Sequence, residues 1–82
     1  MSSGDKAIIA SSLVLGMSSI DNPKDFLEKP ISSVANGMIV GTLYGIGAEL
    51  VSTNFNENQK VIFAGLITAA AVYHFAKKIF TN

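Results

Sequence analysis

Two long apolar stretches dominate the pattern of hydrophobic and polar positions along the chain. Residues 31–48 carry no charged side chain, and neither do residues 61–76. A soluble helix of this length normally has a charged face, whereas a membrane-spanning helix takes about 20 mostly apolar residues. The pattern therefore predicts two transmembrane helices, over about residues 31–53 and 59–80.

The connection between these helices is short and polar. Residues 54–60 read NFNENQK, a run rich in asparagine. A connection of this length joins neighbouring helices that run in opposite directions. The expected fold class is therefore all-α, with an antiparallel transmembrane hairpin of two spans in residues 31–82.

The segment of residues 1–30 has a different character, and we expect it to lie at the membrane interface or dock on a partner. Its apolar part, residues 7–20, would be only about 21 Å long as a helix, too short for a hydrocarbon core of about 30 Å. Asp5 is expected to cap this helix, beginning at residue 6 or 7. A signal-peptide core is the alternative, but one lysine balanced by Asp5 and no A-x-A-like site argue against it.

A short second element is expected before the first long helix. Asp21 or Asn22 would cap it, with Pro23 at its first position. It would cover residues 24–29, an interfacial turn or short helix that Pro30 ends.

A ladder of small residues is the strongest motif in the chain. The small-residue ladder of the first long helix consists of Ser33, Gly37, Gly41, Gly45 and Ala48. Glycine in a soluble helix costs about 1 kcal/mol against alanine, but small residues allow close helix packing in a bilayer. The second long helix offers a small face consisting of Gly65, Thr68, Ala69 and Ala76. The two faces would either close the hairpin on itself or pack against neighbouring chains.

Several polar residues stand near the expected membrane boundaries, where we assign them as anchors. They are Glu49, Lys60, Tyr73, His74, Lys77 and Lys78. Glu49 is expected to reach the head groups or to pair with Lys60; a proton-handling role and contact with a partner chain are the alternatives. Tyr73 and His74 fit an interfacial belt.

Composition narrows the possible functions. The 82 residues have zero net charge, 49 % hydrophobic residues, no cysteine and no arginine. Such a chain is poorly suited to nucleic-acid binding and has no thiolate metal ligands. No nucleophile–base pair, phosphate-binding loop or metal cluster can be assembled, so we expect no enzyme activity, cofactor or metal.

Lysine distribution predicts an orientation. A two-span hairpin would place both chain ends on one side, with five of the six lysines: Lys6, Lys24, Lys29, Lys77 and Lys78. The positive-inside rule then assigns both ends to the cytoplasmic or matrix-like side.

The leading functional prediction is a small, non-catalytic integral membrane subunit of a larger assembly. Its partners would be lipid and other subunits, or further copies of itself, in a respiratory-type complex or the membrane layer of a virus particle. In length and topology alone the chain resembles the two-span phage holins, which implies a self-oligomerising, membrane-permeabilising protein as an alternative. A soluble helical scaffold buried in a large assembly is the other alternative.

Overall fold

The computed structural model describes residues 2–20 and 27–81, and all regular structure in these ranges is helical. The helices are α1 (Ser3–Ile20), α3 (Pro30–Val51) and α4 (Glu57–Thr81). The all-α prediction is confirmed, and the two long helices begin and end within two residues of their predicted bounds. Half of the short element expected over residues 24–29 lies outside the described residues; in the other half, residues 27 and 28 are helical.

α1 begins earlier than the sequence pattern predicted. Its cap is Ser2, not Asp5: the Ser2 Oγ accepts a 3.1 Å hydrogen bond from the Asp5 backbone N–H. The same hydroxyl donates to the Asp5 carboxylate at 2.8 Å. This reciprocal capping satisfies a free N–H of the first turn, so the helix includes residues that we expected to precede it.

The two long helices also have defined starts. Pro30 occupies the first turn of α3, where its missing N–H costs nothing. α4 starts with a capping box: Asn56 Oδ1 accepts from the Gln59 N–H at 2.9 Å, and Gln59 Oε1 accepts from the Asn56 N–H at 3.0 Å. Phe55 and Phe63 pack edge to face, with ring centroids 5.7 Å apart, and hold the turn against α4.

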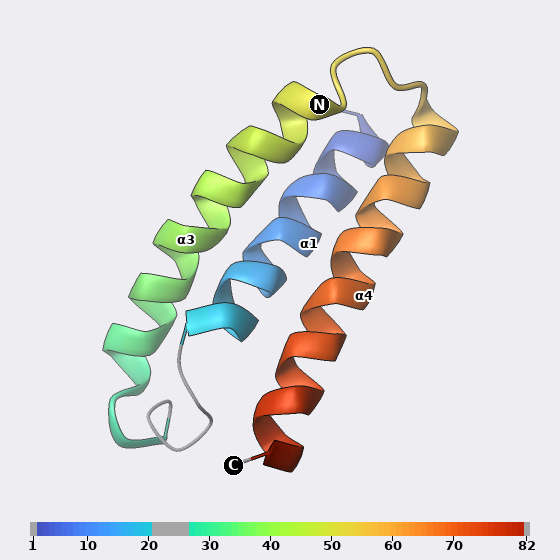
Figure 1. Ribbon diagram of the computed structural model, residues 1–82. Coiled ribbons are helices and arrows are strands. Elements are labelled where there is room, and N and C mark those ends of the chain that lie inside the picture. The colour runs from blue at the N-terminus through green and yellow to red at the C-terminus, as the bar shows by residue number, and fades with distance from the viewer. Residues whose placement is uncertain (1, 21–26, 82) are drawn as a thin grey trace.

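The three helices form a flat layer with α1 in the middle (Figure 1). α1 runs antiparallel to α3 and parallel to α4, and it packs closely against both. The molecule measures 40 × 23 × 16 Å, so its thinnest dimension is little more than one helix with its side chains, about 10–12 Å. The segment expected to dock on a partner therefore docks between the two long helices of its own chain.

The N-terminal end of α1 lies beside the turn between α3 and α4, and the C-terminal end of α4 lies at the opposite end of the layer (Figure 1). The backbone N–H of Gly4 donates to Glu57 Oε2 at 3.0 Å, and this hydrogen bond holds the first turn of α1 against the start of α4. The start of α1 and the end of α4 thus lie at opposite ends of the helices, whereas we expected both chain ends on one side. That expectation assumed that α1 does not run the length of the layer.

Burial within the layer is reversed from that of a soluble domain. Among the described residues, the buried apolar side chains are Ile8, Ala48, Ala64 and Ala71, the first three of which form one cluster, and five serines are also buried. Large apolar side chains lie on the outside; for example, Ile31 is 86 % exposed and Leu50 is 72 % exposed. The inner surfaces are therefore built from small residues, and the outer surface is apolar.

Candidate functional site

The small-residue ladder of α3 faces α1. All five of its members are buried. A Cβ added to Gly41 would lie 2.6 Å from the Leu13 Cα, and one added to Gly37 would lie 2.9 Å from the Met17 Cα. These distances leave no room for a side chain, so the glycines allow backbone-to-backbone contact between α1 and α3.

Gly16 of α1 is the partner that the sequence analysis missed. A Cβ at Gly16 would collide with the backbone of Gly41 and would come within 2.6 Å of the Gly37 carbonyl oxygen. The signal was present in the sequence, because Ser12 and Gly16 are small residues four apart, the spacing that marks close helix contacts. The large apolar residues Val14 and Met17 of the same helix are 52 % and 39 % exposed.

The small face predicted on α4 is not the face that packs against the other helices of this chain. Gly65, Thr68 and Ala69 are exposed, and a Cβ added to Gly65 would meet no atom within 4 Å. α4 instead buries Ala64 and Ala71. The reason is that α4 packs against α1 and not against the ladder of α3, so a different side of the helix turns inward. Ala76, near the end of α4, is half-buried.

Hydroxyls on α1 and α4, two of them buried, bond to their own helices. Ser11 donates to the Ala7 carbonyl at 2.7 Å, Ser18 to Leu15 at 2.8 Å, and Thr68 to Ala64 at 2.9 Å. Such bonds satisfy a hydroxyl without water. Ser12 is the exception, because its buried Oγ has no hydrogen-bond partner among the described residues.

A cluster of charges ties α1 to α4 at the turn end of the layer. Lys60 Nζ lies 2.8 Å from Asp5 Oδ1, and both side chains are largely shielded from solvent. The hydrogen bonds from Lys60 and then Ser2 lower the pKa of Asp5 from its ordinary 3.8 to about 2. Lys60 thus pairs with Asp5, and the predicted pair between Lys60 and Glu49 is replaced by this contact.

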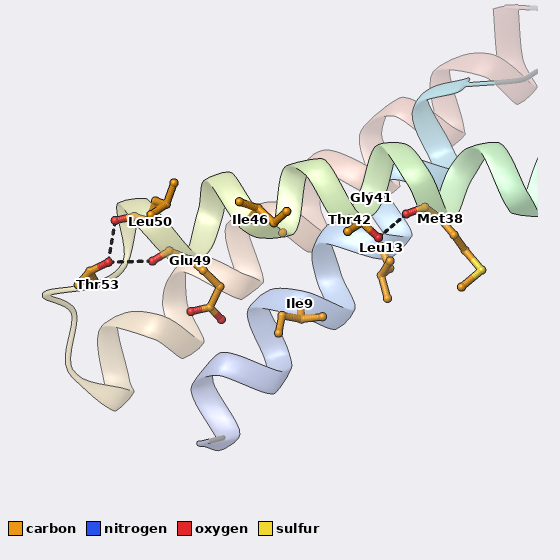
Figure 2. A pocket seen from close by; sticks show the side chains of 10 residues that line it. Ile9, Leu13, Met38, Gly41, Thr42, Ile46, Glu49, Leu50 and Thr53 are labelled. Atoms are coloured by element: carbon orange, nitrogen blue, oxygen red, sulfur yellow. Dashed lines mark hydrogen bonds between the residues drawn. The ribbon is translucent and has the colours of Figure 1, made fainter.

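Glu49 lies in a groove between α1 and α3, on the side of α3 next to the small-residue ladder (Figure 2). The groove has a volume of about 610 Å³. Its lining residues are Ile9, Leu13, Met38, Gly41, Thr42, Gly45, Ile46, Glu49, Leu50 and Thr53. Gly41 and Gly45 make the groove deep, because they have no side chain to fill its floor. Glu49 projects from α3 toward α1, and its Oε1 is buried with no hydrogen-bond partner among the described residues.

The remaining predicted anchors lie toward the other end of α4. Tyr73 and His74 are exposed, with ring centroids 5.9 Å apart in an edge-to-face contact. Lys77 is exposed and Lys78 is half-buried in the last turns. This arrangement is compatible with an interfacial belt above a lysine-bearing helix end.

The described residues contain no group of three or more acidic, histidine or cysteine side chains arranged to hold a metal ion. What they do contain is a set of close helix contacts, an apolar exterior and one carboxylate in a groove. No protein-family model, curated protein sequence or solved structure matches this chain.

Proposed function

We propose that this protein is a small, non-catalytic integral membrane protein that serves as a structural or assembly subunit of a larger complex. The observation that carries the proposal is the reversed burial: serines and glycines lie inside the helix contacts, and large aliphatic and aromatic side chains lie outside. Water would oppose this arrangement, because exposed apolar surface costs about 25 cal/mol per Å². A bilayer favours it.

The two long helices support the same proposal. Pro30–Val51 and Glu57–Phe80 are long and apolar enough to cross a membrane, and only 17 % and 11 % of their most apolar windows are buried inside the protein. The core helix of a soluble protein passes the same length test but is mostly buried. Here the apolar surface needs another covering, and lipid supplies one along both helices.

α1 is the third membrane-embedded helix in this proposal. Its uncharged part, residues 7–20, gives about 21 Å of helix, which would span most of a hydrocarbon core of about 30 Å and leave the charged first turn at the interface. Because α1 packs between α3 and α4, lipid covering those helices would also cover the two open faces of α1. This extends the antiparallel two-span hairpin to a three-helix layer.

An embedded α1 also changes the proposed orientation. The two ends of the chain would lie on opposite sides of the membrane. The end with Lys29, Lys77 and Lys78 carries more lysine than the turn end, which has Lys6 and Lys60. The positive-inside rule then places the C-terminal end of α4 on the cytoplasmic or matrix-like side and the start of α1 on the other.

An assembly role follows from surfaces that the fold leaves open. A Cβ added to Gly47 or Gly65 would meet nothing within 4 Å, so these small residues serve no contact within the chain. Such positions suit packing against neighbouring membrane helices, from other subunits or a second copy. The holin-type alternative rested on a two-span topology, and an embedded α1 gives a different one.

Carbonate extraction tests the membrane proposal against a soluble scaffold covered by protein partners. Membranes from cells expressing the chain are washed at high pH and sedimented. We expect the protein to stay in the pellet with a known integral marker, because three apolar helices remain in lipid. Release into the supernatant with a peripheral marker would favour the scaffold and contradict the proposal.

A further inference from the structure

The groove between α1 and α3 combines an apolar lining with a single carboxylate near one end. It extends from Met38 on α3 to Thr53, just after α3 ends, and the helical part of this stretch is about 20 Å long. Glu49 lies at the end of this groove next to the turn, two residues before α3 ends. One leaflet of the hydrocarbon core is about 15 Å thick, so the groove is long enough for an acyl chain.

The charges around Glu49 favour a cationic occupant. Its charged neighbours are Asp5 and Lys60, and Lys60 already binds Asp5 at 2.8 Å. Glu57 of α4 lies in the same cluster and accepts from the Gly4 N–H. Among the described residues, three carboxylates therefore lie near one ammonium group, the Asp5 carboxyl is within hydrogen-bonding reach of Glu49, and no nitrogen or hydroxyl donor reaches the buried Glu49 Oε1. A buried carboxylate oxygen needs a donor or a counter-charge.

From these contacts we infer that the groove binds a phospholipid whose head group ends in a primary ammonium, as in phosphatidylethanolamine. The ammonium donates to Glu49 at the membrane boundary, and one acyl chain lies along Ile9, Leu13 and Ile46. The inference rests on the proposed membrane location. Charge complementarity and the open apolar channel leading from Glu49 into the bilayer together favour a lipid over a soluble amine.

The test measures lipid retained on the purified protein by native mass spectrometry, after reconstitution in vesicles of defined composition. The vesicles contain phosphatidylethanolamine and phosphatidylcholine with identical acyl chains, in equal amounts. The two head groups differ only in three methyl groups that remove the N–H donors. We expect wild type to retain the ethanolamine lipid preferentially, by about tenfold, the size of one hydrogen bond to a charged group.

Three variants separate the head-group contact from the groove and from general charge. Glu49→Gln should abolish the preference between the two lipids. Glu57→Gln removes the same charge from the same end but outside the groove, and it should keep the preference. Thr42→Phe places a ring in the groove from an exposed position and should lower retention of both lipids.

Two results would overturn the inference while the membrane proposal stands. One is equal retention of both lipids by wild type, or an unchanged preference in Glu49→Gln, with the protein still in the carbonate pellet. The other is a zero-length carbodiimide crosslink from Glu49 to a lysine of a second chain, which would show that protein occupies the groove. Release from the membrane by carbonate would instead count against the proposed function itself.

Discussion

Among the described glycines, Gly16 leaves the least room for a side chain, because an added Cβ would collide with the Gly41 backbone, and Gly45 and Gly47 leave more room. A Cβ at Gly16 collides with the backbone of Gly41, whereas one at Gly45 meets only the Ser12 Cβ at an ordinary 3.7 Å. At Gly47 nothing lies within 4 Å. Glycine therefore has three different roles in one chain. At Gly16 and Gly41 it allows backbone contact, at Gly45 it leaves room for a methyl group, and at Gly47 it lies on an open surface.

This grading predicts different effects for the same substitution. Gly16→Ala should lower the free energy of unfolding by about 1–3 kcal/mol, because the added methyl group forces α1 away from α3. Gly47→Ala is the matched control in an open position, where alanine is the better helix former. Unfolding in mixed micelles, followed by circular dichroism, measures both. Equal destabilisation by the two variants would contradict the close contact between α1 and α3.

Among the helices, α1 holds the layer together, because it packs against both α3 and α4. Its contacts differ along its length. Small residues meet α3 near Gly16, and Ile8 fills the core with Ala48 and Ala64. At its first turn, Asp5 and Gly4 bond to Lys60 and Glu57 of α4. The polar tie lies at the end of the helix where water is available, and the apolar contacts lie between the ends.

The tie between Asp5 and Lys60 predicts a pH dependence at this end of α1. Because the pKa of Asp5 is lowered to about 2 in the folded state, the tie stabilises the contact above about pH 4. That contribution is lost as the pH falls from about 4 to about 2. Glu57 of α4 and Glu49 of α3 titrate nearby, so the Asp5 contribution is isolated by comparing variants.

Pyrene labels on Ser3→Cys and Asn58→Cys, two exposed positions near the contact, report the opening. We expect excimer emission to fall between about pH 4 and pH 2 as the end of α1 separates from α4. In Asp5→Asn the step assigned to Asp5 should be missing, and in Lys60→Gln it should move toward pH 4. An identical titration in all three proteins would show that Asp5 does not control the contact.

For the whole molecule, the position of α1 determines how the chain would lie in a membrane. A two-span hairpin with α1 on the surface puts the start of α1 on the same side as the end of α4. The three-helix layer puts the start of α1 beside the turn between α3 and α4 (Figure 1). The two arrangements predict opposite accessibility for the same residue.

Single-cysteine labelling separates them directly, since the natural chain has no cysteine. We expect Ser3→Cys and Asn58→Cys to react with a membrane-impermeant thiol reagent from one side of sealed vesicles. Lys77→Cys should react only from the other side. Labelling of Ser3→Cys together with Lys77→Cys would restore the two-span arrangement with α1 at the interface.

The sequence by itself determined the elements of this protein. Uncharged runs of sufficient length are a local property, so the predicted ranges 31–53 and 59–80 came within two residues of the bounds of α3 and α4. The ladder at Ser33, Gly37, Gly41 and Gly45 likewise follows from helical spacing alone. These features need no knowledge of neighbours, because hydrophobicity and periodicity belong to each segment separately.

Only the tertiary structure decided which helix the ladder contacts. Two small faces could pack against the ladder: one on α4 at Gly65 and Ala69, and one on α1 at Ser12 and Gly16. Their spacing alone cannot rank them, because the choice depends on backbone approach distances and on where each connection lets a helix lie. The ladder contacts α1 because glycine faces glycine at Gly16 and Gly41. The ion pair between Asp5 of α1 and Lys60 of α4 also holds α1 in this position. The same choice sets the position of Glu49 beside an open groove.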